Sequence, residues 1–204
     1  PFAVINPATG RAIAEVTAAD SDQAERAMES ARQAFSQWRE MPTLARGALL
    51  LKLADTLAEH REALAQLESL CSGKTITLAR MLELDQSVAF LRYFAGWAGK
   101  VTGETLDVSL PSMAGEKYTA FTRRQPLGVV VGIVPWNFSI MIAIWKLAAA
   151  LVCGCTIVLK PSEYTPLTLL RVAELAKAVG IPDGVINVVN GAGGEIAQRL
   201  DRKS

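Results

Sequence analysis

Hydrophobic residues in the first hundred positions recur at steps of three and four, which is the spacing of one face of a helix. Before them, two short apolar stretches, 2–5 and 12–16, flank a turn at 6–10 and predict an opening hairpin. Asp20 followed by Gln23 indicates the start of the first helix. Its inward face is expected to carry Ala24, Ala27, Met28, Ala31, Phe35 and Trp38.

Two further helices are predicted before residue 100. The longer one spans about 43–72, with Gly73 as its stop and a kink expected near 60–62. Its inward face consists of Leu49, Leu53, Leu57, Leu64 and Leu67. The next helix is predicted to turn inward a face that consists of Met81, Leu84, Val88, Leu91 and Ala95.

From residue 127 the pattern changes to short apolar runs that alternate with helical segments. Strands are predicted at about 128–134, 156–160 and 185–189, with helices at about 139–152 and 165–179. Thr165-Pro166 suits the N-cap and first turn of the second helix, and Gly180 suits its C-cap. This alternation favours right-handed crossovers, and therefore an α/β fold with a parallel sheet and flanking helices. Three strands make only half of a dinucleotide-binding sheet, so the fold is expected to be partial.

The hydrophobic pattern is interrupted between these two parts. Residues 107–114 are rich in Pro, Ser and Gly and indicate a boundary, and 118–124 alternates like an exposed strand. We therefore divide the chain into a hairpin and helices at 1–114, a strand segment at 115–126 and a βαβαβ unit at 127–204.

The charges argue against a nucleic-acid or membrane partner. The chain has 21 basic and 20 acidic residues, which are intermixed and form no basic face or polybasic patch. Its longest charge-free stretch, 125–145, contains two prolines and suits a strand and turn better than a bilayer span.

Cysteine and histidine usage favours a reduced, cytoplasmic protein without a metal site. Cys71, Cys153 and Cys155 are an odd number and lie in apolar or helical surroundings, which is not the pattern of a disulfide framework. His60 is the only histidine and cannot build a zinc site.

Polar side chains follow two of the predicted strands, at the points where each apolar run ends. Pro-Trp-Asn at 135–137 follows the first run and Lys-Pro-Ser-Glu at 160–163 follows the second. Ligands bind at the carboxyl ends of strands in open parallel sheets. The glycines nearby do not match the Gly-x-Gly-x-x-Gly fingerprint, so by spacing alone they indicate turns and close packing rather than a standard Rossmann site.

Several motifs occur together in the order and spacing of one family. They are Asn-Pro-Ala-Thr-Gly at 6–10, Pro-Trp-Asn-Phe at 135–138, Trp-Lys at 145–146, Lys-Pro-Ser-Glu at 160–163 and the segment 180–191. In this respect the chain resembles the NAD(P)-dependent aldehyde dehydrogenases (EC 1.2.1). The resemblance implies a variant Rossmann sheet without the glycine trio, and it makes 115–126 part of an oligomerisation element of a homodimer or homotetramer.

The resemblance also implies catalytic roles. Asn137 would donate its side-chain amide to the oxyanion that forms when a cysteine thiolate attacks the aldehyde and gives a thiohemiacetal. Lys146 would act in structure or proton movement, and a charged residue on an apolar helix is expected to have a partner. Ser139 stands where proline is more usual in the family, and we expect its hydroxyl to cap the following helix.

The cofactor implied by the resemblance is NAD. Glu163 would accept hydrogen bonds from ribose hydroxyls and repel a 2′-phosphate, although a small neighbour such as Ser162 leaves NADP open. The expected cofactor-binding residues are Ile133, Val134, Pro135, Trp136, Lys160, Ser162, Glu163, Gly193 and Gly194.

The substrate implied by the resemblance is a small aldehyde, apolar or aromatic. The expected lining residues are Phe138, Met141, Ile142 and Trp145, whose helical spacing alone would equally suit a core face. Segments at 67–74, 104–111 and 118–124 are similar to phenylacetaldehyde dehydrogenase-type members.

The family's nucleophilic cysteine and general-base glutamate are expected downstream of these motifs, so the catalytic domain is absent from this chain. We interpret the three cysteines as structural and expect this polypeptide alone to be inactive. It begins at Pro1 rather than Met, and neither Pro1 nor Ser204 is expected to be a natural end. A truncated, non-catalytic dinucleotide-binding or oligomerisation module is the alternative.

Overall fold

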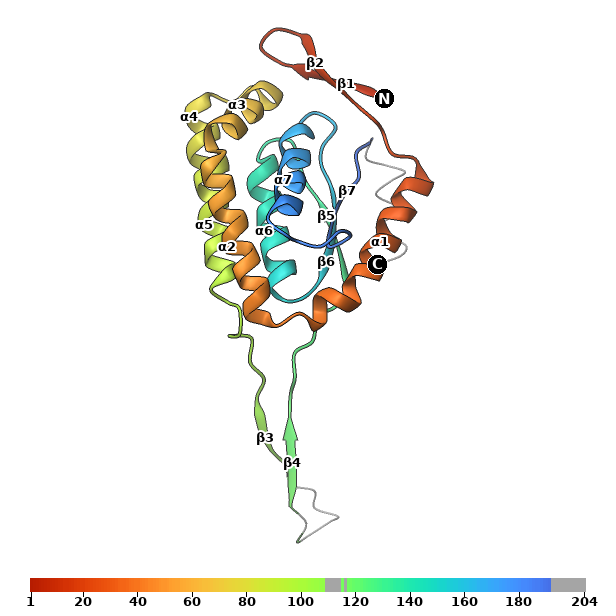
Figure 1. The fold of residues 1–204 in the computed structure, drawn as a ribbon, viewed down its shortest axis with the longest axis vertical. Coiled ribbons are helices and arrows are strands. Elements are labelled where there is room, and N and C mark those ends of the chain that lie inside the picture. The colour runs from red at the N-terminus through yellow and green to blue at the C-terminus, as the bar shows by residue number, and fades with distance from the viewer. Residues whose placement is uncertain (109–114, 116, 192–204) are drawn as a thin grey trace.

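The computed structural model describes residues 1–108, 115 and 117–191. It contains a hairpin at the N-terminus, an α/β body and an arm of two strands that projects from the body (Figure 1). The hairpin and the arm lie at opposite ends of the molecule, and the body between them holds the parallel sheet. No described helix combines the length and apolar character that crossing a membrane requires.

The N-terminal hairpin and the first helix follow the sequence pattern. Strand β1 (Phe2–Asn6) pairs antiparallel with β2 (Arg11–Val16), as predicted. Helix α1 (Ser21–Glu40) opens with a capping box, in which the Asp20 carboxylate accepts from the Gln23 N–H and the Gln23 side chain accepts from the Asp20 N–H. The cap satisfies two backbone donors and fixes where α1 begins.

The parallel sheet has the order β5-β6-β7, formed by Val129–Ile133, Thr156–Lys160 and Ile186–Val188. Helices α6 (Ser139–Val152) and α7 (Leu167–Ala178) make the two crossovers. Every residue of β6 is buried, as expected for a central strand covered on both faces. The predicted α/β unit is therefore present, and its three strands end at one edge.

The sheet lies between two layers of helices (Figure 1). Helix α1 covers one face, where Ala24, Met28 and Ala31 pack on Val158 and Val189. Helices α6 and α7 cover the other face and share the main core with the helices α2 (Thr43–Glu59) and α5 (Gln86–Ala95) outside them. Trp38, at the end of α1, belongs to this second core and so joins the two layers.

The long predicted helix is divided at His60 into α2 (Thr43–Glu59) and α3 (Arg61–Ser72), which confirms the expected kink. Gly73 ends α3 in the left-handed conformation, with φ of 75°. The short α4 (Ile76–Leu78) follows.

The next segment departs from the prediction. Residues Ala79–Asp85 form a π-helix, η1, before α5 (Gln86–Ala95) begins. Because a π-helix has more residues per turn, the face that points inward shifts. Met81, predicted to be inward, is 55% exposed, whereas Glu83 is fully buried. The expected position of Met81 is thus wrong, and an acidic side chain takes the inward place.

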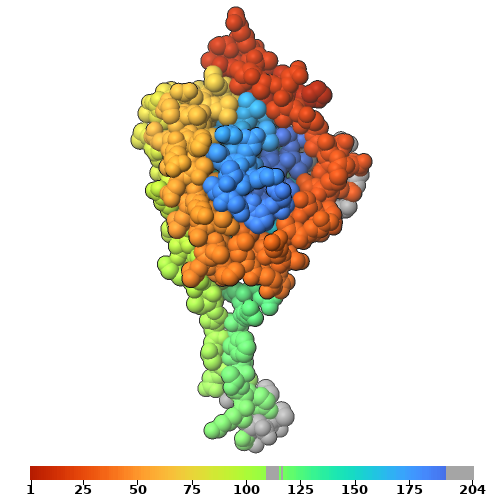
Figure 2. Space-filling model, viewed as in Figure 1, coloured from red at the N-terminus to blue at the C-terminus, as the bar shows by residue number. Residues whose placement is uncertain are grey.

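The projecting arm contains one strand that the sequence pattern did not reveal. Strand β3 (Thr105–Val108) pairs antiparallel with β4 (Tyr118–Phe121) and lies partly in the segment predicted to be irregular. Figure 2 shows the arm as a narrow extension of the body. It carries large apolar side chains in the open, of which Phe121 is 70% exposed.

Helix α7 differs from the prediction at its start. The Thr165-Pro166 pair suggests a threonine cap, but the N-cap residue is Pro166 and no side chain caps the helix. The end agrees with the sequence: Gly180 has φ of 99°, and its N–H donates to the carbonyl of Lys177. A residue with a side chain would be strained there, which explains why the helix stops before it.

Candidate functional site

The sequence-predicted polar residues lie at the carboxyl edge of the sheet. Ile133, the last residue of β5, pairs in register with Lys160, the last residue of β6. One residue further, the Val134 N–H donates to the Lys160 carbonyl at 3.0 Å. The Trp136-Asn137 turn and the 160–163 segment therefore leave adjacent strands at the same edge, as the two motifs predicted.

The turn after β5 presents its side chains to solvent. Val134 is buried, whereas Ile133 and Trp136 are each 55% exposed. Pro135 and Asn137 are also exposed. A buried anchor followed by exposed residues leaves the Asn137 amide free to meet a ligand at the sheet edge.

The turn after β6 is more enclosed. Lys160 is 3% exposed, and its Nζ donates to the Pro161 carbonyl at 3.0 Å. Burial lowers the pKa of Lys160, and the negative charge of Glu163 opposes that shift. Ser162 is buried and its Oγ accepts from the Tyr164 N–H at 3.3 Å, whereas Glu163 is half-buried.

Lys146 does not have the partner expected for it. Its side chain is exposed, so water can solvate the ammonium group, and the described residues include no ion-pair partner for it. Its stem reaches Gly132, where a Cβ would lie 3.3 Å from the Lys146 Cδ and 2.7 Å from the Leu159 Cδ2. The absence of a side chain at Gly132 thus lets the lysine stem pass close to β5.

The residues predicted to line the substrate pocket, at the N-cap and on one side of α6, are neither fully buried nor fully exposed. Phe138, Met141 and Ile142 are half-buried, and Trp145 is 40% exposed. The Trp145 ring packs on Phe90 of α5, with centroids 5.0 Å apart and a tilt of 58°. Ile142 also packs against the main core. These contacts are consistent with a substrate pocket and also with a core face.

Sequence reasoning missed a group of buried charges beside this helix. Glu68 of α3 and Glu83 of η1 are fully buried, and the Lys74 ammonium donates to both carboxylates. We call Glu68, Lys74 and Glu83 the buried ion cluster. Burial and the charge of Glu68 raise the pKa of Glu83, against the effect of Lys74.

Ser139 belongs to the surroundings of this cluster and does not cap α6. The N-cap position is occupied by Phe138, without a side-chain cap. The Ser139 hydroxyl is buried and lies 2.8 Å from both carboxylate oxygens of Glu68, to which it donates. The expected capping role of Ser139 is therefore wrong.

A sequence signal for the cluster did exist. Glu68 follows Leu64 by four residues and so falls on the inward face of its helix, where an acidic residue is unusual. Glu83 carries no such signal, because only the π-helix turns it inward. The partners of the cluster on α6 lie more than fifty residues further along the chain.

The described cysteines have the properties of structural residues. Cys71 and Cys155 are buried and Cys153 is exposed. Burial raises the pKa of Cys71 to about 12, helped by the charge of Glu68. Burial and Cys155 also raise the pKa of Cys153. None of the shifts produces the lowered pKa of an activated thiolate, and no group of His, Cys, Asp and Glu in the described ranges could hold a metal ion.

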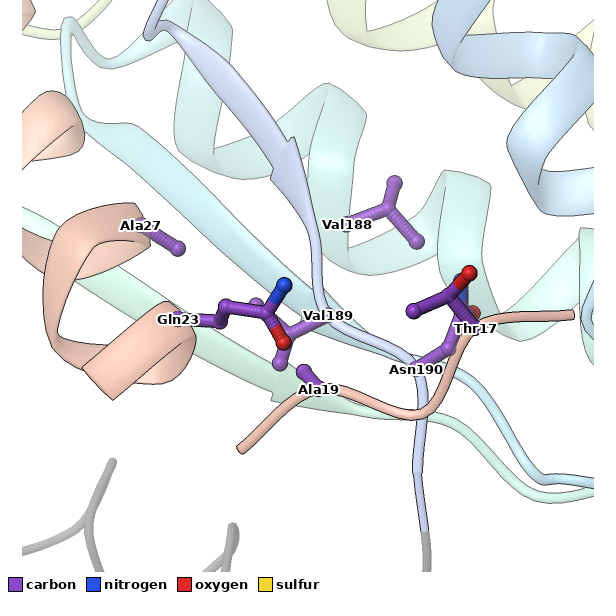
Figure 3. A pocket seen from close by; sticks show the side chains of 7 residues that line it. All are labelled: Thr17, Ala19, Gln23, Ala27, Val188, Val189 and Asn190. Atoms are coloured by element: carbon purple, nitrogen blue, oxygen red, sulfur yellow. The ribbon is translucent and has the colours of Figure 1, made fainter. Parts of the chain in front are cut away.

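A shallow pocket of about 190 Å³ opens between the start of α1 and the end of β7 (Figure 3). It is lined by Thr17, Ala19, Gln23, Ala27, Val188, Val189 and Asn190, none of which was predicted to bind the cofactor. Its volume is below that of pockets that enclose organic ligands. Gly193 and Gly194, predicted to be near the adenine, lie outside the described residues.

The geometry defines an α/β domain whose parallel sheet carries polar residues at its carboxyl edge, the class that includes nucleotide-binding domains. The model of the aldehyde dehydrogenase family matches residues 1–204. The chain belongs to this family, which confirms the resemblance seen in its motifs.

Individual relatives support the same conclusion. The phenylacetaldehyde dehydrogenase of Pseudomonas fluorescens is 48% identical over 201 residues, which cover 98% of this chain and 40% of the relative. Aldehyde dehydrogenase, cytosolic 1, of Rattus norvegicus is 46% identical over 207 residues, with the same two shares of 98% and 40%.

Solved structures match the fold as well. The NAD⁺ complex of an aldehyde dehydrogenase from Bacillus cereus is 44% identical and superimposes with a TM-score of 0.92, covering 98% of this chain and 40% of that chain. The predicted partial α/β fold is thereby confirmed. The chain spans about 40% of the length of these relatives.

Proposed function

We propose that this chain is part of an NAD(P)-dependent aldehyde dehydrogenase, which oxidises an aldehyde to a carboxylic acid. The observation that carries the proposal is the common sheet edge at which Asn137, Lys160 and Glu163 leave two adjacent, hydrogen-bonded strands. An amide donor beside an ammonium and a carboxylate suits a site that stabilises an oxyanion next to a bound dinucleotide.

The residues at this edge fit the ribose of a dinucleotide. Among the described residues, the Lys160 ammonium makes one hydrogen bond, to Pro161, and so has two further hydrogens to donate to hydroxyl groups. The half-buried Glu163 carboxylate can accept from the same hydroxyls. Exposed Ile133 and Trp136 offer apolar surface beside them. When bound, NAD supplies the hydride acceptor.

Within this chain, the chemical step would fall to Asn137. Its exposed amide N–H can donate to the oxygen on which negative charge develops during attack on the aldehyde carbonyl. The nucleophile and the general base would come from the part of the protein that these relatives have beyond the matched 40%. Lys146 would act in structure or proton movement.

We further propose an apolar or aromatic aldehyde as substrate. The half-buried side chains of Phe138, Met141 and Ile142, together with the Trp145–Phe90 ring pair, offer an apolar wall on the side of α6 that follows Asn137. The similarity to a phenylacetaldehyde dehydrogenase supports an arylalkyl aldehyde in particular.

The arm is proposed to be part of an oligomerisation element, in a homodimer or homotetramer. Among the described strands, β3 and β4 pair with each other and with no third strand, and they carry exposed apolar residues, among them Leu106 and Phe121. Unpaired strand edges and exposed apolar side chains favour pairing with another chain.

The proposed function is tested by an assay of the full-length protein with phenylacetaldehyde and NAD. We expect NADH and phenylacetate to appear in equal amounts, and the cytoplasmic fraction to contain the activity. Binding of NAD without NADH formation, over a series of aldehydes, would instead support a non-catalytic dinucleotide-binding module.

Replacement of Glu163 by serine should change the choice of cofactor. Loss of the carboxylate removes an acceptor for ribose hydroxyls and a charge that repels a 2′-phosphate. The ratio of kcat/KM for NADP to that for NAD should therefore rise about tenfold, the usual effect of a hydrogen bond to a charged group. Glu163→Asp, which keeps the charge, is the control and should retain the preference for NAD. An unchanged ratio in Glu163→Ser removes this residue from cofactor selection.

A further inference from the structure

The buried ion cluster lies directly behind the residue proposed to stabilise the oxyanion. It connects α3 and η1 with the first turn of α6, and that turn begins two residues after Asn137. We propose that Glu83 and Ser139, held by Glu68 and Lys74, are positioning residues that fix the first turn of α6 and thereby the direction of the Asn137 amide. This inference rests on the proposed role of Asn137.

Glu83 holds the backbone of the turn. Its Oε2 accepts from the Met141 N–H at 2.9 Å. Met141 is the third residue of α6, and the first N–H groups of a helix have no partner within the helix. Since no side chain at the N-cap satisfies them, a carboxylate from another helix takes the place of a local cap.

The side chain of Ser139 anchors the first residue of α6. Its hydroxyl donates to the Glu68 carboxylate, which also accepts from the Thr168 hydroxyl at 2.9 Å and from Lys74 at 3.1 Å. Glu68 is thus bound from α6, from α7 and from the loop after α3. A carboxylate with three fixed donors has little freedom, and so the first residue of α6 is held with it.

Lys74 contacts both carboxylates of the cluster and the residue before α6. Its Nζ donates to both carboxylates and lies 5.3 Å from the centroid of the Phe138 ring. A cation at this distance from a ring face is attracted to it. Phe138, Ser139 and Met141 are therefore each held by one member of the cluster, and Asn137 is joined to Phe138 by a peptide bond.

The secondary structure is consistent with a positioning role. Glu83 reaches Met141 only because η1 is a π-helix, whose shifted register turns Glu83 inward and Met81 outward. Such π-helical segments are less favourable than an α-helix and occur frequently at functional sites.

The burial of these charges also supports a positioning role. A buried group of two carboxylates and one ammonium is costly to desolvate, and hydrophobic residues of similar volume commonly serve stability as well or better. The raised pKa of Glu83 reflects this cost. A cluster whose contacts converge on one helical turn is therefore better explained by what it positions than by stability alone.

The test uses the full-length enzyme and the variants Ser139→Ala and Glu83→Ala. We expect kcat to fall about tenfold in Ser139→Ala and up to about a hundredfold in Glu83→Ala, because small displacements of a catalytic group cost this much. The KM for NAD should not change, since Lys160, which ends β6, and Glu163, in the turn after it, make no contact with the cluster among the described interactions. If Glu83→Ala fails to fold, Ser139→Ala decides, because it removes one hydroxyl and leaves the charges paired.

Glu62→Ala is the matched control. Glu62 also joins α3 to η1, through an ion pair with Arg80 at 2.6 Å, but this pair lies at the surface. Its removal should leave kcat unchanged, because surface ion pairs contribute little and this one does not touch α6.

A double-mutant cycle separates the inference from the proposed function. If Ser139 acts through Asn137, the variant with both residues changed to alanine should be as slow as Asn137→Ala alone, within about twofold. Multiplied effects would overturn the inference, and so would a wild-type rate in Ser139→Ala beside a slow Asn137→Ala. A wild-type rate in Asn137→Ala would contradict the proposed function itself.

Discussion

Replacement of Asn137 by alanine in the full-length enzyme is expected to lower kcat about a hundred- to a thousandfold, the usual cost of removing one oxyanion donor. Asn137 is exposed in the turn after β5, next to the strand that carries Lys160, which leaves its amide accessible to a reacting carbonyl at the sheet edge. NAD affinity should stay the same, because the residues proposed to bind the ribose follow β6.

The measurement pairs steady-state kinetics with NAD binding followed by calorimetry. Asn187→Ala is a suitable control, because the Asn187 amide is already used to donate to the Gly184 carbonyl at 2.7 Å. Its kcat should match that of the wild type. Weakened NAD binding in Asn137→Ala would instead make Asn137 a cofactor residue, and unchanged turnover would remove it from the oxyanion site.

The sequence pattern predicted those features of the fold that are determined by neighbouring residues. The capping box at Asp20 and Gln23, the break at His60 and the stop at Gly180 each depend on residues within one or two turns. Strand β3 was missed because its alternation of polar and apolar residues covers only four positions, Thr105–Val108, and runs directly into the segment rich in Pro, Ser and Gly. The π-helix was missed because Met81, Leu84 and Val88 also have α-helical spacing, which does not reveal that the observed inward face includes Glu83 instead of Met81.

One part of the candidate site could be predicted from the sequence and another part could not. The two motifs at 135–137 and 160–163 were predicted to meet because parallel strands bring their carboxyl ends to one edge, and the register of β5 and β6 has them adjacent. The buried ion cluster depends on contacts between residues as far apart in sequence as Glu68 and Thr168. No spacing rule predicts such a contact, because it arises from how α3, η1, α6 and α7 pack.

Replacement of Trp38 by alanine should lower the free energy of unfolding by about 3–5 kcal/mol, the typical loss for a large buried aromatic residue. Trp38 is 0% exposed and is the largest fully buried side chain among the described residues. Its indole N–H donates to the Leu151 carbonyl at 3.2 Å, in the last turn of α6. The substitution would leave a cavity and remove one donor to the Leu151 carbonyl, which also accepts from the Gly154 N–H at 3.0 Å.

The effect should be large because Trp38 is the one fully buried residue of α1 in the core on the far face of the sheet, where Ala34 is only partly buried. Ala24, Met28 and Ala31 pack on one face of the sheet, whereas Trp38 packs in the core of the other face. Urea unfolding followed by circular dichroism measures the loss. Trp38→Phe keeps most of the ring but not the N–H, so it should cost about 1 kcal/mol for the lost hydrogen bond, because the Leu151 carbonyl keeps the Gly154 N–H as a donor. If Trp38→Ala and Trp38→Phe lose the same amount, the hydrogen bond to Leu151 rather than packing joins α1 to α6.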